Sequence, residues 1–352
     1  MIDYRALLNN VFYSYSASSK GNNLMKLMKP AIFVCLSILL LNGCRNTAAE
    51  QSKPLIGIVQ FGEEPNVEVC KKGILEALSE EGFKDGENIE IIYRNAQADF
   101  AMVHSITQDF AMKKVDILTP LSTPCLQSAT QLASRNKDIK VVFTYVFDPY
   151  RVGAAKTPED HLPNVTGVSC FPPVERILDT IRESFPERTK VGVVWNSSEA
   201  NSEAVILKLR AHAAVIGLDI VEATVTGTAE VLEASRSLVN RGAQVFLGAG
   251  DNTVNLGFDG FTKVANENKI PVFTTDTELI DGSLIAVGPD FHRTGYDGGK
   301  YIARVLRGEK TSDLPIFQTK ETLFIINMNT ANKLGFKIPD EIIGKAGKVI
   351  GN

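Results

Sequence analysis

The stretch LIGIVQFGEEPN at residues 55–66 decides the architecture of this chain of 352 residues. It opens with an apolar run over residues 55–59, typical of a buried strand, and continues into a polar loop. An amphipathic segment over residues 67–81 follows and predicts a helix that Gly82 ends. A buried strand, a polar loop and a helix in this order form the first unit of an α/β fold.

The same unit continues along the first half of the chain. Apolar, β-branched runs predict strands over residues 89–93, 115–118 and 141–145, and amphipathic segments predict helices over 100–113 and 125–134. Strands that alternate with helix-length segments indicate right-handed crossovers and a parallel sheet.

The second half repeats the first. A strand is predicted over residues 191–194 and a helix over 199–216, and later strands over 244–247 and 272–274 match 115–118 and 142–144. Four residues of the first unit recur 135 positions later: Gly57, Glu64, Asn66 and Gly82 as Gly192, Glu199, Asn201 and Gly217. Shared loop lengths indicate a structural duplication, so we predict an α/β protein with two doubly wound parallel-sheet lobes.

The N-terminal region carries the features of a secretion signal. Lys26 and Lys29 precede an apolar run over residues 31–41, which is shorter than the roughly 20 residues of a membrane-spanning helix. The run leads into Leu-Asn-Gly-Cys at residues 41–44, which resembles a lipobox with Asn42 as an unusual member. We predict a signal peptide over 1–43, with lipid on Cys44 and a linker over 44–54. The alternative is an uncleaved anchor helix. Residues 1–24 precede any sensible signal, which indicates a true start at Met25 or Met28.

Composition and motifs exclude several classes of function. A net charge of -4 argues against a nucleic-acid binder. The four histidines are scattered, and Cys70, Cys125 and Cys170 allow at most one disulfide and show no zinc spacing, so no metal is predicted. Residues 248–250 (GAG) lack the third glycine of a dinucleotide fingerprint, and no catalytic constellation is visible. The sequence therefore predicts no cofactor and no enzyme.

Polar residues gather in the loops that follow the strands of both halves. Such loops meet at the carboxyl edge of a parallel sheet, where ligands bind. Each is also explained by helix capping, worth about 1 kcal/mol, and Trp195 by core packing. Found in both halves, they predict a ligand shell made of Glu64, Pro65, Ser122, Thr123, Tyr145, Asp148, Trp195, Asn196, Glu199, Asp251, Asn252 and Asp276.

From residue 55 to about 339 the chain resembles the ABC transporter substrate-binding proteins of the tryptophan/tyrosine type, which have the type I periplasmic binding fold. The resemblance departs at Glu64-Pro65, where His-Pro is common, at Trp195, where tyrosine is usual, and in a longer segment over 150–163. It rests on IGIVQ (56–60), NAQ (95–97), VFT (142–144), DP (148–149), NVTGV (164–168), NSSEANS (196–202), DNTV (251–254) and KVANE (263–267).

The resemblance implies a lipid-anchored, extracytoplasmic monomer that captures a solute and delivers it to an ABC permease and its ATPase. Aromatic amino acids are the expected solutes; a sugar, a nucleoside or a role as a ligand-sensing partner are the alternatives. The fold implies three crossings between the lobes, near Cys170, Leu284 and Pro315. We therefore expect lobe 1 to comprise 55–169 and 285–314, and lobe 2 to comprise 170–284 and 315–352.

An amino acid would present two charged groups to this cleft. Its carboxylate would meet Ser122, Thr123 and the N–H groups of the following helix. Its ammonium group would meet Glu199, Asp251 or Asp276. Trp195 and Tyr145 would flank its side chain.

Overall fold

The computed structural model describes residues 53–351, so the predicted signal peptide and Cys44 lie outside the described residues. None of the helices in the described range is long and apolar enough to cross a bilayer. The strands are β1 (Leu55–Gln60), β2 (Glu90–Asn95), β3 (Ile117–Leu121), β4 (Lys140–Val146), β5 (Val165–Ser169), β6 (Lys190–Asn196), β7 (Asp219–Val225), β8 (Val245–Gly248), β9 (Val272–Thr274), β10 (Ile285–Pro289), β11 (Phe317–Gln318), β12 (Thr322–Asn327) and β13 (Lys348–Ile350). The α-helices are α3 (Pro65–Glu80), α4 (Phe100–Met112), α5 (Thr123–Arg135), α6 (Val174–Ser184), α7 (Ala200–Ile216), α8 (Val231–Asn240), α9 (Asn252–Leu256), α10 (Phe258–Glu267), α11 (Phe291–Leu306), α12 (Met328–Leu334) and α13 (Asp340–Lys345).

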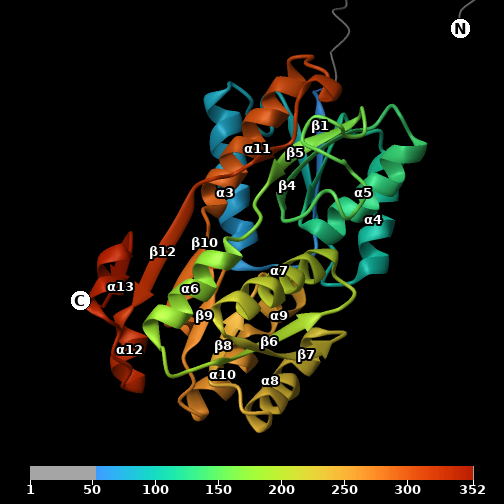
Figure 1. Cartoon of the computed structure of the whole chain (residues 1–352). Helices are drawn as coiled ribbons and strands as arrows, with labels where there is room; N and C mark the ends of the chain where they lie inside the picture. The colour runs from blue at the N-terminus through green and yellow to red at the C-terminus, as the bar shows by residue number, and fades with distance from the viewer. Residues whose placement is uncertain (1–52, 352) are drawn as a thin grey trace, which may run out of the picture. The chain divides into compact units, whose positions relative to one another are not determined.

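Lobe 1 is built on a parallel sheet of six strands in the order β11-β5-β4-β3-β1-β2. Helices α3 and α11 lie side by side on one face, and α4 and α5 cover the other (Figure 1). The alternation along β1 explains the two layers, because Ile58 packs in the core under α3 and Val59 in the core under α4.

Lobe 2 is built on seven strands in the order β13-β12-β10-β9-β8-β6-β7, parallel except for the antiparallel pair β10 and β12. Helices α6 and α7 pack on one face, α8 and α10 on the other. The structure confirms the predicted fold class of two doubly wound lobes, with the β10–β12 pair as the departure from purely parallel pairing.

The duplicated glycines have the same use in both lobes. A Cβ at Gly57 would stand 2.9 Å from the Phe110 ring of α4, and one at Gly192 would stand 3.1 Å from Leu238 of α8. Each glycine therefore lets a helix approach the first strand of its lobe closely. This requirement explains why the first strand of each half carries a glycine at its third position.

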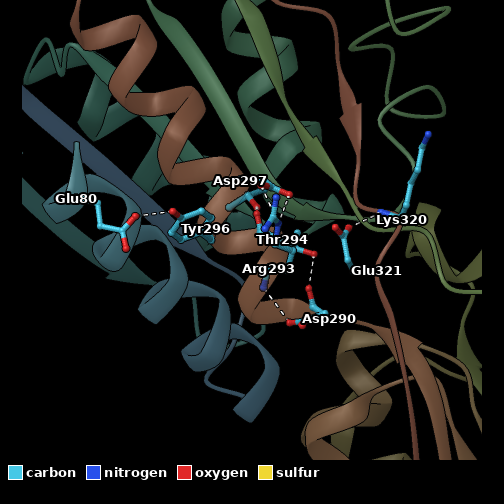
Figure 2. A network of polar contacts seen from close by, with 9 residues as sticks. Glu80, Asp290, Arg293, Thr294, Tyr296, Asp297, Lys320 and Glu321 are labelled. Carbon is cyan, nitrogen blue, oxygen red and sulfur yellow. Dashed lines mark hydrogen bonds and ion pairs between the residues drawn. The ribbon is translucent and has the colours of Figure 1, made fainter. Parts of the chain in front are cut away.

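Three segments cross between the lobes and together form the hinge. They are residues 170–173 between β5 and α6, Asp290 between β10 and α11, and residues 319–321 between β11 and β12. Backbone hydrogen bonds tie them together: Thr319 N donates to Ser169 O at 2.9 Å, and Asp290 N donates to Glu321 O at 3.1 Å. Figure 2 shows Asp290 beside Glu321, with Arg293 N donating to the Asp290 carboxylate at the start of α11.

The second and third crossings differ from the expected positions. Residues 285–289 belong to lobe 2, because β10 pairs with β9 and β12 and the chain leaves only at Asp290. Phe317 and Gln318 belong to lobe 1, because β11 pairs with β5. The second crossing therefore comes after Pro289 instead of near Leu284, and the third comes after Gln318 instead of near Pro315. Strand pairing decides both positions, and local sequence pattern does not reveal it.

Candidate functional site

A small cavity lies between the carboxyl ends of the two sheets. The cavity volume, measured as the space open to the centre of a water-sized sphere, is about 10 Å³, which is room for roughly one water molecule. Lobe 1 contributes the start of α5 and the end of β4, and lobe 2 contributes the starts of α7 and α9. Its lining residues are Ser122, Thr123, Tyr145, Phe147, Asn201, Gly250 and Asn252.

The start of α5 presents donors to this cavity. Ser122 has a φ of 95°, which no ordinary L-residue prefers, and its Oγ is buried without a hydrogen-bond partner in the described range. Thr123 Oγ1 accepts from Phe147 N at 3.3 Å, which joins the helix start to the end of β4. A strained loop that aims a hydroxyl and a helix N-terminus at one point suits an anionic group.

Glu199 organises the opposite side from within lobe 2. It is 1 % exposed and precedes α7. Its Oε1 accepts from Thr253 N at 3.0 Å and Thr253 Oγ1 at 2.7 Å. Its Oε2 accepts from Asn252 N at 3.2 Å, from Asn252 Nδ2 and from Asn201 Nδ2 at 3.1 Å. Both carboxylate oxygens of Glu199 already accept hydrogen bonds from lobe 2. Glu199 therefore has a structural role here in place of the expected role as acceptor for a ligand ammonium group.

Asp251 is used in the same internal way. Its Oδ1 accepts from Val254 N at 2.8 Å and caps α9, and its Oδ2 accepts from Asn196 N and Ser202 Oγ at 2.6 Å each. Asn196 Nδ2 in turn donates to Thr253 Oγ1 at 3.0 Å. Asp251 and Asn196 therefore join the loops after β6 and β8.

Five residues hydrogen-bond across or beside the cleft, and we call them the inter-lobe latch. Asn255 Nδ2 of lobe 2 donates to Glu64 Oε2 of lobe 1 at 3.0 Å, and Tyr145 OH donates to the same oxygen at 3.5 Å. Asn66 Nδ2 of lobe 1 donates to Asp276 Oδ1 of lobe 2 at 2.8 Å. All five side chains are buried. The lobes are therefore closed upon each other in this structure.

Burial raises the pKa of the carboxyl groups of Glu64, Asp251 and Asp276, and no basic side chain of residues 53–351 is among the groups that offset this rise. The pKa of Glu64 lies well above its usual range, first because of burial and second because Asp276 is close. Burial raises the pKa of Asp276 to about 7, and burial with neighbouring Glu199 raises that of Asp251 to about 8. Clusters of such groups in a cleft are typical of functional sites.

Four buried side-chain atoms at the cleft have no hydrogen-bond partner within residues 53–351: Glu64 Oε1, Ser122 Oγ, Asn201 Oδ1 and Asn255 Oδ1. Unpaired buried polar atoms are rare, since each loses the hydrogen bonds that water would make. Three of these atoms are acceptors and the fourth is a hydroxyl. A ligand that carries both an ammonium group and a carboxylate would match this set.

Three predicted residues lie away from the cavity. Trp195 Nε1 donates to Glu222 Oε2 of β7 at 2.9 Å, and the ring packs with the core under α6 and α7. Pro65 is exposed at the first turn of α3. Asp148 closes a turn by accepting from Tyr150 N and Arg151 N. The expected Trp195 wall is therefore wrong for this arrangement, because the strand directs the indole to the α7 face.

The sequence missed five residues that the structure brings to the site: Asn66, Phe147, Asn201, Gly250 and Asn255. Phe147 lines the cavity opposite Gly250, and Asn66 and Asn255 complete the latch. One signal was available for the asparagines, since Asn66 and Asn201 occupy equivalent places in the repeat. Asn255 and the Phe147–Gly250 contact belong to no repeat, and only the closed lobes bring them into place.

Cys70, Cys125 and Cys170 are buried, free thiols. Burial raises the pKa of Cys70 and of Cys125 to about 12, so these two stay protonated and unreactive at neutral pH. Among the described residues, no group of three metal-ligating side chains is arranged to hold a metal ion.

Comparison with known proteins gives one family. The model of the family described as ABC transporter substrate binding protein matches residues 55–350. A curated relative, the tyrosine-binding protein of Clostridioides difficile strain R20291, is 33 % identical over an alignment of 321 residues that covers 88 % of this chain and 92 % of the relative.

Two solved structures are informative because one contains a ligand and the other is ligand-free and open. A domain from Streptococcus pneumonia in complex with L-Trp has 29 % identity and a TM-score of 0.80, covering 85 % of this chain and 100 % of its own. The ligand-free, open structure of a substrate-binding protein with adhesive properties from Clostridium difficile has 34 % identity with the same coverages, yet a TM-score of 0.63.

Proposed function

Since this chain belongs to the family of ABC transporter substrate-binding proteins, a family of transport proteins and not of enzymes, we propose that its ligand is an aromatic α-amino acid held between the lobes. The observation that carries the proposal is the set of unpaired buried atoms at the cleft, above all Ser122 Oγ of lobe 1 and Asn201 Oδ1 of lobe 2. A ligand that bridges the lobes would satisfy both.

The carboxylate and the ammonium group have separate places in this scheme. The carboxylate meets Ser122 Oγ and the N-terminus of α5, where the helix dipole favours negative charge. The ammonium group meets Asn201 Oδ1 and the acidic side of the cleft, which includes Glu64 and Asp276. The Tyr145 and Phe147 rings, 6.5 Å apart between centroids, offer an apolar surface to the side chain.

The two solved relatives support a closing motion. The chain is closer in shape to the L-Trp complex than to the open, ligand-free structure, although its sequence is closer to the latter. A rotation of two lobes about a hinge lowers a TM-score without changing either lobe. The cavity is too small for an aromatic amino acid, so entry requires the three crossings to let the lobes part.

The relatives also supply the ligand class for this proposal. One curated relative is named a tyrosine-binding protein, and one solved relative holds L-Trp. A sugar or nucleoside is less suitable, because a neutral ligand offers no ammonium group to the buried carboxyl groups of Glu64 and Asp276, which would then have to take up a proton.

The test is calorimetric titration with L-tyrosine, L-tryptophan and L-phenylalanine, and with a hexose and a nucleoside as rivals. We expect an amino acid to bind, and at about 100 times its dissociation constant to stabilise the protein by about 2.7 kcal/mol. N-acetyl-L-tyrosine and L-tyrosine methyl ester, which lack one charged group each, should bind much more weakly. Binding of the hexose or the nucleoside alone would contradict the proposal.

Ser122→Ala tests the carboxylate end. Loss of a hydrogen bond to a charged group should weaken binding by about 1.5–3 kcal/mol. Thr130→Val is the matched control, since Thr130 lies on α5, the helix that Ser122 precedes, and its buried hydroxyl also has no partner among residues 53–351 but does not line the cavity. Equal effects of the two substitutions would place the carboxylate elsewhere.

The proposal includes anchoring by lipid on Cys44, with the protein acting as a monomer beside its permease and ATPase. Its support is the lipobox-like Leu-Asn-Gly-Cys at residues 41–44. Cys44→Ala should abolish incorporation of labelled fatty acid and release the protein from the membrane. Normal signal removal with unchanged membrane retention would show that the anchor lies elsewhere.

A further inference from the structure

Glu64 and Asp276 come together only because the lobes are closed. Glu64 precedes α3 of lobe 1, and Asp276 follows β9 of lobe 2. They are 2 % and 0 % exposed, and each accepts a hydrogen bond from an asparagine of the opposite lobe, Glu64 from Asn255 and Asp276 from Asn66. Parting of the lobes separates these contacts and returns both carboxyl groups towards water.

No Lys, Arg or His of residues 53–351 is among the groups that act on this pair. The charged groups that act most strongly on Glu64 are Asp276, Glu199 and Asp251, all acidic, and the adjacent Tyr145 is neutral. Glu64 Oε1 accepts no hydrogen bond from residues 53–351. Burial of two carboxylates that face each other is unfavourable unless a positive charge compensates them.

Glu64 differs in this respect from a structural carboxylate. Its counterpart in the repeat, Glu199, accepts five hydrogen bonds from its own lobe. Glu64 accepts two, and one of these crosses the cleft. Stabilising lobe 1 therefore does not account for a buried acid at this position.

We propose that Glu64 and Asp276 form a charge-sensing pair, so that closure of the lobes requires one positive charge there: a ligand ammonium group when ligand is bound, and a proton when it is absent. The part that concerns the ammonium group rests on the proposed function; the part that concerns the proton does not. Tyr145 connects the two, since it lines the cavity and touches Glu64.

The pair makes ligand-free closure dependent on pH, with a definite sign. Burial in the closed cleft raises the pKa of Asp276 to about 7 and that of Glu64 in the same direction, whereas exposed carboxyl groups titrate near pH 4. The closed form therefore binds a proton that the open form releases. Protonation favours closure fully below about pH 4, and this contribution is lost as the pH rises from about 4 to about 7. Within that window the ratio of closed to open protein falls by up to roughly tenfold per pH unit for one linked proton.

Small-angle X-ray scattering of the ligand-free protein between pH 8 and pH 5 tests the proton. We expect the radius of gyration to fall as the pH is lowered, with unchanged circular dichroism. Glu64→Gln and Asp276→Asn should reduce this dependence, and the double variant should be closed at every pH. Glu63→Gln is the matched control, because Glu63 is exposed beside Glu64 and should leave the wild-type response unchanged. A wild type without pH dependence, or a dependence that survives in the double variant, would overturn the proposal.

Titration with L-tyrosine and N-acetyl-L-tyrosine tests the ammonium group. The wild type should prefer L-tyrosine, and Glu64→Gln should reduce that preference at least tenfold. An undiminished preference in this variant would overturn the ligand part of the proposal. If L-tyrosine, L-tryptophan and L-phenylalanine all fail to bind the wild type, the proposed function fails, while the scattering result still decides whether the pair senses a proton.

Discussion

Glu64-Pro65-Asn66 of lobe 1 and Glu199-Ala200-Asn201 of lobe 2 occupy equivalent places, each at the start of the first helix of its lobe. In lobe 2 the glutamate and the asparagine bond to their own lobe, at residues 250–253 and at each other. In lobe 1 both reach across the cleft, Glu64 to Asn255 and Asn66 to Asp276.

The difference shows how a duplicated fold gains a binding site. In lobe 2, Glu199 and Asn201 form their hydrogen bonds within the lobe, so this side of the cleft is held in place without lobe 1. In lobe 1 the equivalent residues, Glu64 and Asn66, form hydrogen bonds to lobe 2, and these bonds exist only when the lobes are closed. We infer that one copy of the motif builds structure and the other couples the lobes.

The largest expected effect distinguishes the two glutamates by stability. Glu199→Ala should lower the free energy of unfolding by about 3 kcal/mol or more, because it leaves the donors of Asn252 and Thr253 buried and unpaired. Glu64→Ala should lower it by less than about 1 kcal/mol. Urea unfolding of both variants without ligand is the measurement. Equal losses would show that the two copies of the motif have the same structural role.

A glycine pair tests the closure of the cleft. Gly250 and Gly217 have φ values of 72° and 73°, so alanine strains both alike. A Cβ at Gly250 would lie 2.2 Å from Phe147 Cε2 of the other lobe, and one at Gly217 would meet nothing within 4 Å. Gly250→Ala should therefore weaken ligand binding by about 2 kcal/mol through overpacking. Gly217→Ala should leave affinity unchanged, and similar affinity losses would argue against contact across the cleft.

The asparagines should separate closure from stability. Asn66→Ala removes hydrogen bonds that exist only between lobes, so it should weaken ligand binding by about 1 kcal/mol without lowering the stability of the open form. Asn201→Ala should lower both quantities, because Asn201 also bonds within lobe 2. Calorimetry and urea unfolding measure them. A stability loss in Asn66→Ala that matches Asn201→Ala would remove the contrast.

The smallest expected effect concerns Trp195. Trp195→Phe loses the hydrogen bond to Glu222 and should lower the free energy of unfolding by about 1 kcal/mol, with ligand affinity within about twofold of wild type. In the wild type, a non-fluorescent ligand should leave tryptophan emission nearly unchanged. Strong quenching by phenylalanine would return the indole to the cleft.

Local sequence pattern determined the fold class and most of the first-half elements. Apolar, β-branched runs and amphipathic helices each depend on residues near in sequence, so the alternation of strands and helices and its repeat after 135 residues could be predicted. Ser122, Thr123, Tyr145 and Asn252 line the cavity at the carboxyl edge, because parallel strands bring such loops to one edge, and their contact with a ligand stays a prediction.

Only the tertiary structure decided which polar group meets which partner. Trp195 and Asn196 are neighbours in sequence, but alternation along β6 directs the indole to the α7 face while Asn196 bonds to the loop after β8. Strand pairing moved the crossings to Asp290 and to residues 319–321. The different uses of Glu64 and Glu199 depend on groups 191 and 53 residues away, at Asn255 and Asn252. Hydrogen bonds over such separations follow from packing the lobes together, which no local pattern encodes.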